Sequence, residues 1–240
     1  MSNLPNAFDA YDDASQPAMV IPDYAETFVR VPKQPLVRRP ATLTEITGPT
    51  LLAHKLKPGD NDLAHPYEGR PRAMGLLISV SGHVVDEDAR PVRGAVIELW
   101  HANSAGRYIH PMDEKSPNPI DPNFIGSGRV ATDEYGRYEF RTIKPGAYPY
   151  PNHPTRWWRP PHIHLSIFGD GFMSRLVTQM FFPGDPFNDI DLILGSVPDP
   201  KARARMIAHQ IPMADMPVVN VLGFEHDIVL RGHRQTPFGM

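Results

Sequence analysis

Short segments in which apolar and polar residues alternate recur along the chain, with turn-forming residues between them. Residues 75–85 and 95–100 are rich in β-branched side chains, and the stretch 86–94 between them is rich in turn formers, so we expect two neighbouring antiparallel strands. Alternation returns in residues 136–143. Because successive side chains point to opposite faces of a strand, one face there would carry Tyr138, Phe140 and Thr142.

Three more segments have the composition of strands, at residues 162–168, 175–182 and 224–231. A helix is favoured at about 200–210, because Asp199 can cap it and Pro200 suits its first turn. One side of that helix would carry Ala202, Met206 and Gln210. The pattern therefore predicts an all-β protein, a sandwich or barrel with long loops and one short helix in its C-terminal half.

The N-terminal part of the chain is broken by proline, which accounts for 28 of the 240 residues. Residues 1–40 have no sustained period and predict an extended arm. Thr42-Leu-Thr-Glu45 fits a helix capping box, but Gly48-Pro49 would end that helix almost at once. We expect the arm and this short turn to occupy residues 1–70, and one β-rich domain to occupy residues 71–240.

Composition excludes several classes of function. A net charge of −3, without dense runs of Lys or Arg, argues against nucleic-acid binding. The absence of cysteine rules out disulfides and thiolate metal sites, so any metal would be held by His, Asp, Glu or Tyr. The N-terminus lacks a basic stretch followed by an apolar run, and no segment approaches the roughly 18 apolar residues of a membrane span. We therefore expect a soluble cytoplasmic protein.

Two histidines are the first candidates for metal chemistry. His162 and His164 lie in a strand-like run, so both imidazoles would point to one face while Ile163 points to the other. Just before them, the segment 157–161, Trp-Trp-Arg-Pro-Pro, places aromatic rings and a fixed positive charge beside the pair. The alternative is a hydrogen-bonded structural pair beneath an ordinary aromatic loop.

Two tyrosines extend this candidate site. Tyr108 lies in the long loop 101–128, and Tyr148 follows the break that ends strand 136–143. A phenol titrates near 10, so it binds a metal at neutral pH only when a hard, highly charged ion such as Fe(III) removes its proton. Tyr108 and Tyr138 each end an identical tripeptide, Gly-Arg-Tyr, and only the alternation around Tyr138 assigns that residue to the core. A packed structural ring remains the alternative for each tyrosine.

Three motifs occur in order along the chain: Leu99-Trp-His-Ala-Asn-Ser-Ala-Gly-Arg-Tyr108, Thr142-Ile-Lys-Pro-Gly-Ala-Tyr148 and Trp158-Arg-Pro-Pro-His162-Ile-His164. Together they closely resemble the intradiol ring-cleaving dioxygenases. The resemblance extends from about Pro22 to Phe238 and implies that residues 71–240 form a catalytic domain with that family's β-sandwich fold.

The resemblance implies one mononuclear Fe(III) ion per chain. Its ligands would be Tyr108 and His162 in equatorial positions and Tyr148 and His164 in axial positions. Tyr148 would also accept a substrate proton, and Arg159 would stabilise negative charge on the reacting ring. The substrate pocket would include Tyr24, Trp100, Tyr150, Gln179 and Ile193.

The chain departs from the family pattern at two places near the pocket. The loop between Tyr148 and Arg159 is one residue longer, and Tyr150 stands where tryptophan is usual. Both departures bear on the shape of the pocket and leave the four ligands in place.

The implied activity is cleavage of an aromatic diol by dioxygen. Relatives that act on catechol or hydroxyquinol carry a helical N-terminal dimerisation region, whereas this chain has a proline-broken arm, which favours the protocatechuate-cleaving group. That group implies a related α subunit, with the active site near the subunit interface and apolar arm residues buried on the partner. Two alternatives come from other classes: a zinc hydrolase that uses His162 and His164 with a carboxylate, and a non-catalytic sandwich subunit.

Overall fold

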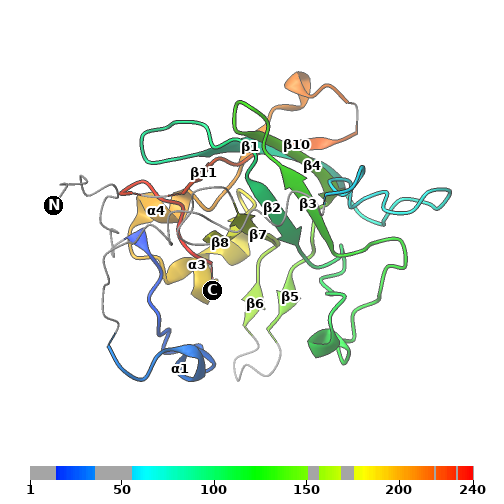
Figure 1. The fold of residues 1–240 in the computed structure, drawn as a ribbon. Coiled ribbons are helices and arrows are strands. Elements are labelled where there is room, and N and C mark those ends of the chain that lie inside the picture. The colour runs from blue at the N-terminus through cyan, green and yellow to red at the C-terminus, as the bar shows by residue number, and fades with distance from the viewer. Residues whose placement is uncertain are drawn as a thin grey trace.

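The computed structural model describes residues 15–35, 56–150, 157–168, 176–218, 220–230 and 232–239. The predicted capping box and the middle of the loop between Tyr148 and Arg159 lie outside these residues. Most of the described chain is strand and loop, as the all-β prediction requires, and Figure 1 shows the strands gathered at the centre with short helices beside them. Within the described ranges, no helix is both long and apolar enough to cross a membrane.

One sheet has five strands and is built around β1, Leu77–Val85. One edge of β1 pairs antiparallel with β4, Arg137–Ile143. The other edge pairs parallel, first with β10, Leu222–Glu225, and then with β11, Ile228–Val229. Strand β9, His209–Ile211, adds to β10. The single strand predicted over 224–231 is thus observed as two strands that share one neighbour.

The second sheet has four antiparallel strands in the order β3-β2-β7-β8. Their bounds are Ser127–Ala131 for β3, Val96–Trp100 for β2, His162–Phe168 for β7 and Leu176–Phe181 for β8. A separate two-stranded hairpin pairs β5, Tyr148–Pro149, with β6, Trp158–Arg159, and in Figure 1 it projects below the sheets. Strands β3, β5, β6 and β9 were not predicted, because short strands within loop-rich sequence carry little alternation.

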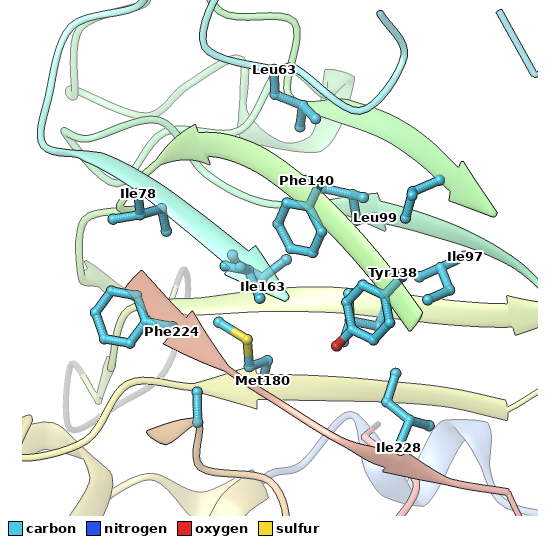
Figure 2. Close-up of a cluster of buried hydrophobic side chains, with 14 of the residues drawn as sticks. Leu63, Ile78, Ile97, Leu99, Tyr138, Phe140, Ile163, Met180, Phe224 and Ile228 are labelled. Atoms are coloured by element: carbon cyan, nitrogen blue, oxygen red, sulfur yellow. The ribbon is translucent and has the colours of Figure 1, made fainter. Parts of the chain in front are cut away.

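The core lies between the two sheets. Tyr138 and Phe140 of β4 face Ile163 of β7 and Met180 of β8, and all four side chains are buried (Figure 2). The predicted shared face of β4 is confirmed, since Tyr138, Phe140 and Thr142 are all buried. Burial of alternate residues from both sheets is the main force that stabilises such a sandwich.

The predicted pairing of the first two strands was wrong. β1 and β2 lie in different sheets: β1 pairs with β4, β10 and β11, and β2 pairs with β3 and β7. The connection 86–94 holds an isolated bridge between Val85 and Pro91 and ends at Gly94, whose φ is +69°. It is much longer than a two-residue hairpin turn and long enough to cross the roughly 10 Å between packed sheets.

The predicted helix at 200–210 is shorter than expected. Helix α4 spans Pro200–Ala204, and the Asp199 side chain caps it as predicted, accepting hydrogen bonds from two backbone N–H groups. Met206 and Ala208 exchange backbone hydrogen bonds with Phe181 of β8, and this pairing ends the helix. Gln210 therefore lies in β9, exposed, and does not continue the apolar face.

Five shorter helical elements in the described ranges stand outside that prediction. Helix α1, Thr27–Arg30, corrects the expectation of a fully extended arm, because the Thr27 hydroxyl donates to the Tyr24 carbonyl and accepts from the Ile21 N–H. Helix α3 spans Leu192–Gly195, and its cap residue Asp191 also binds Arg159 of β6. The 3-10 turns are η3, Pro111–Asp113, η4, Pro186–Asp189, and η5, Met213–Asp215.

Candidate metal centre

Strand β7 presents two imidazoles on one face. Ile163 points into the core, so its neighbours His162 and His164 point away from it. The His164 ring stacks on Trp100 of β2, with ring centres 4.8 Å apart and the rings parallel. His162 Nδ1 donates to the Pro160 carbonyl oxygen at 2.8 Å, because a carbonyl can only accept. In the neutral His162 ring, Nε2 therefore carries a free lone pair.

Tyr108 is held by the loop that follows β2. Asn103 Oδ1 accepts the N–H groups of Ala105 and Arg107, and Asp113 Oδ2 accepts the Tyr108 N–H at 2.7 Å. The Arg107 guanidinium binds the far side of the loop by donating to the carbonyl oxygens of Glu114, Ser116 and Asn118. This loop fixes the backbone of Tyr108 without a regular element.

Tyr148 is held by the β5–β6 hairpin, where it lies opposite Arg159. Two glycines allow its loop to pack against the Tyr108 loop. Gly106 has a φ of +78°, and a Cβ there would collide with the Ala147 carbonyl oxygen. A Cβ on Gly146 would collide with the backbone of the Tyr108 loop in the same way. The two tyrosine loops therefore touch through backbone.

The four predicted ligands converge. Tyr108 Oη lies 3.3 Å from His162 Nε2 and 3.2 Å from His164 Nε2. Tyr148 Oη lies 3.5 Å from Tyr108 Oη and 3.5 Å from His162 Nε2. Three separate segments thus direct two phenol oxygens and two imidazole nitrogens at one point.

Burial keeps these four groups neutral. It raises the pKa of Tyr108 well above that of a free phenol, and it raises the pKa of Tyr148 despite the opposing Arg159 charge. Burial and then Arg159 lower the pKa of His162 well below its usual value, and the same two causes lower the pKa of His164 to about 3. At neutral pH the imidazoles therefore offer lone pairs, while the phenols keep their protons unless a strong cation displaces them.

This donor set fits a hard, highly charged metal ion. Phenolate oxygen favours a ferric ion over zinc, and a ferric ion supplies the charge needed to ionise both buried tyrosines. Across the described parts of the chain, no carboxylate joins His162 and His164 to make a three-ligand set. The described residues do contain one group of three possible metal ligands, His83, Glu225 and Asp227, but that group lies toward the surface and away from these histidines. The zinc-hydrolase alternative therefore lacks its third ligand.

Arg159 lies beside the four donors with its guanidinium buried. Its Nη1 is 3.3 Å from His162 Nε2, and its Nη2 donates to Gln179 Oε1 at 2.6 Å. Its Nε donates to Asp191 Oδ2 at 2.9 Å in an ion pair whose side chains are 3% and 0% exposed. The guanidinium also lies over the Trp157 ring, 5.5 Å from its centre. Sequence reasoning missed Asp191, because nothing in its local pattern links it to Arg159.

The remaining predicted pocket residues form a second cluster that touches the first through Trp157. Tyr24, Trp157 and Ile193 are buried together, with Tyr150 packed against them. The Tyr24 and Tyr150 hydroxyls are 2.5 Å apart, and the Tyr150 hydroxyl donates to Glu26 Oε2 at 2.5 Å. The N-terminal segment therefore packs against the loop that carries Trp157 and Arg159. Glu26 was also missed, since it reads as a surface charge.

A family model for dioxygenases matches residues 46–232. The protocatechuate 3,4-dioxygenase beta chain of Burkholderia cepacia is 46% identical over 233 residues, which cover 97% of this chain and 97% of that protein. The chain belongs to the intradiol ring-cleavage dioxygenase family. Another family member, the hydroxyquinol 1,2-dioxygenase of Rhizobium sp. (strain MTP-10005), is 33% identical, with 63% of this chain and 53% of that protein aligned.

Solved structures of intradiol dioxygenases share the fold. The catechol 1,2-dioxygenase of Pseudomonas arvilla C-1 superposes with a TM-score of 0.53 at 26% identity, covering 72% of this chain and 56% of that one. The 3-chlorocatechol 1,2-dioxygenase of Rhodococcus opacus 1CP gives a TM-score of 0.52 at 25% identity, covering 72% and 67%. The predicted intradiol-dioxygenase-like fold is thereby confirmed.

The contact between the two tyrosine loops gives a first prediction. Gly106→Ala should destabilise the protein by about 1–2 kcal/mol for the left-handed backbone and by about 1–3 kcal/mol more for the collision with Ala147, and it should displace Tyr108 from the cluster. Gly94→Ala is the matched control, because Gly94 has a similar φ of +69° but open space around it. Urea unfolding and metal analysis of both variants would measure the difference. Equal losses in stability would show that the loop contact is unimportant.

Proposed function

We propose that this chain is the catalytic, β-type subunit of a protocatechuate 3,4-dioxygenase. It cleaves protocatechuate (3,4-dihydroxybenzoate) between its two hydroxylated carbons with dioxygen and yields 3-carboxy-cis,cis-muconate, a step of aromatic catabolism in the β-ketoadipate pathway. One mononuclear Fe(III) ion is held by Tyr108, Tyr148, His162 and His164. A related α subunit completes a hetero-oligomer, with the active site near the interface.

The observation that carries this proposal is the convergence of two phenol oxygens and two imidazole nitrogens within 3.5 Å of their neighbours. Such a donor set suits Fe(III), whereas neither a structural sandwich nor a zinc site requires two buried phenols at one point. The choice of protocatechuate rests on the Burkholderia beta chain, whose similarity extends over 97% of both proteins. The catechol- and hydroxyquinol-cleaving relatives align over smaller parts of the chain.

The chain's own residues divide the chemistry between them. When bound, Fe(III) supplies the Lewis acidity that ionises a diol and the redox chemistry that opens its ring to dioxygen. Tyr148, which lies on the short β5 strand, would be a phenolate beside the bound ion, and its Oη would then accept a proton from a substrate hydroxyl. Arg159 stabilises negative charge on the ring, because its guanidinium stays protonated even when buried.

The pocket walls come from both clusters. Trp100 supports His164 by stacking, and Gln179 orients Arg159. Tyr24, Tyr150 and Ile193 form the wall on the side of the N-terminal segment. Tyr150 replaces a bulkier indole and binds Glu26, so this wall differs from the usual pattern in shape and polarity.

The decisive experiment is a visible spectrum of the purified protein with and without protocatechuate, together with metal analysis. We expect about one iron per chain, a wine-red colour from tyrosinate-to-iron charge transfer, and a spectral change when protocatechuate binds. Consumption of one dioxygen per protocatechuate and formation of the ring-opened tricarboxylic acid would follow. A colourless, zinc-loaded and fully active preparation would refute the proposal.

Tyr148 gives a second prediction. Tyr148→Phe removes the proposed proton acceptor, so formation of the substrate complex should slow more than the later reaction with oxygen. Stopped-flow mixing under nitrogen isolates the binding step. Tyr24→Phe is a useful comparison, because it removes a hydroxyl from the pocket wall and leaves the four ligands intact. An unchanged anaerobic binding rate in Tyr148→Phe would contradict the assignment.

The partner subunit gives a third prediction. On helix α1, Phe28 is 50% exposed and Val29 is 81% exposed, so this apolar surface would gain from burial on another chain. Expressed alone, the chain should aggregate or bind iron poorly, and co-expression with an α-type subunit should restore a large, active assembly. Sedimentation of the singly expressed chain measures this. A stable, iron-replete monomer with full activity would show that no partner is needed.

A further inference from the structure

Asp191 makes two connections at once, although it lies outside the set of proposed ligands. It precedes helix α3, and its Oδ1 accepts the Leu194 N–H at 2.7 Å, so it caps that helix. Its Oδ2 accepts the Arg159 Nε–H at 2.9 Å. The residue is 2% exposed, so both contacts are made away from water.

The cap alone does not explain a buried carboxylate. A helix N-cap needs only a neutral acceptor, which Asn or Ser supplies as well as Asp. Burying a negative charge is unfavourable unless an opposite charge compensates it. Asp199 caps helix α4 with the same geometry, but its carboxylate has no arginine partner among the described residues and is only half-buried. The charge at position 191 is therefore explained by Arg159.

The pairing leaves Arg159 with one orientation. Asp191 accepts from Nε at 2.9 Å and from Nη2 at 3.4 Å, and Gln179 accepts from Nη2 at 2.6 Å. The third nitrogen, Nη1, is left facing the donor cluster, 3.3 Å from His162 Nε2. Without Asp191, the guanidinium would keep its hydrogen bond to Gln179 and could rotate about that contact.

We propose that Asp191 is the positioning residue for Arg159. It orients Nη1 toward the reaction centre and couples that orientation to the position of helix α3, which carries Ile193 in the pocket wall. The catalytic part of this inference rests on the proposed function. The ion pair between Asp191 and Arg159 does not depend on the proposed function.

The test uses Asp191→Asn in the full-length protein as purified, with its metal and partner subunit. Asparagine keeps the cap acceptor and removes the charge, so α3 should persist while Arg159 loses its anchor. We expect kcat to fall about 10²-fold, as expected for a displaced catalytic group, with little change in KM and unchanged iron content. Asp199→Asn is the matched control, since it makes the same change at the cap of α4, and its kcat should equal that of the wild type.

A double-mutant cycle separates positioning from a general loss of structure. In an Arg159→Gln background, Asp191→Asn should cause no further loss of kcat, and the double variant should unfold at a higher temperature than Asp191→Asn alone, because no unpaired buried charge remains. Additive losses of kcat, or a kcat in Asp191→Asn equal to that of the wild type, would overturn the proposal. If Asp191→Asn does not fold, the neutral double variant compared with Arg159→Gln supplies the same kcat comparison.

The two hypotheses fail in different ways. If the wild-type protein does not cleave protocatechuate, the proposed function is wrong. The thermal-unfolding cycle then still reports on the pairing, because it needs no substrate. If the wild type is active and the unfolding temperatures of the cycle are additive, the proposed function stands and the pairing of Asp191 with Arg159 is refuted.

Discussion

Replacing His162 or His164 by alanine is expected to remove most of the bound iron, the visible colour and the ring-cleaving activity. Each substitution deletes one of four donors whose atoms lie within 3.5 Å of a neighbouring donor, and among the described residues no carboxylate forms a three-ligand group with the remaining histidine. Replacement of His162 would also remove the hydrogen bond that its Nδ1 donates to the Pro160 carbonyl oxygen. Loss of a group that only orients a ligand typically costs 10–100-fold in metal affinity, so loss of a ligand itself should cost more. Iron analysis and the visible spectrum would measure the effect.

Tyr138→Phe is the matched control for this experiment. Tyr138 follows the same Gly-Arg dipeptide as Tyr108, but its hydroxyl donates to the His226 carbonyl oxygen at 2.5 Å within the sandwich core. Removing that hydroxyl should reduce stability by about 1 kcal/mol and leave iron and colour nearly intact. If Tyr138→Phe bleaches the protein and Tyr108→Phe does not, the wrong tyrosine has been assigned to the metal.

Substitution of Arg159 should have the next largest effect on turnover. Arg159→Gln removes the fixed positive charge beside the donors, and kcat should fall by about 10² to 10³, the usual effect of losing one preorganised group that stabilises developing charge. It also leaves the buried Asp191 without its partner, which should destabilise the fold by about 3–5 kcal/mol. Thermal unfolding must therefore accompany the kinetics.

Arg159→Lys distinguishes charge from geometry. Lysine keeps the positive charge but lacks the planar group whose Nε and Nη2 together bind Asp191 and Gln179. We expect stability close to that of the wild type and a kcat well below it. A lysine variant with full turnover would show that the positive charge suffices and that the planar geometry of the guanidinium is unimportant.

Much of the fold followed from local pattern, because β-branched composition marked β1 and β2 and alternation along β4 indicated which of its faces is buried. The pattern does not state which strands pair, and so β1 and β2 were wrongly placed together. The extent of α4 was also misjudged, because its end is set by backbone pairing between Met206 and Phe181, far apart in sequence.

The candidate site was predictable only in part from the residues themselves. The spacing of His162 and His164 on one strand places them on one face. Tyr108 and Tyr148 meet them through loop contacts at Gly106 and Gly146, which no periodicity reveals, and only the resemblance to a known family singled them out. Asp191 was missed because its pairing with Arg159 arises from tertiary packing alone.

The parallel pairing of β1 with β10 and β11 has a consequence for how the protein is made. The partners Ile78 and Leu222 are roughly 140 residues apart along the chain, so one edge of β1 stays open until synthesis is almost complete. Long-range parallel pairing is slow, and an open, apolar strand edge is a site of aggregation. We expect the nascent chain to depend on chaperones, and a chain shortened before residue 222 to aggregate even with every proposed ligand present.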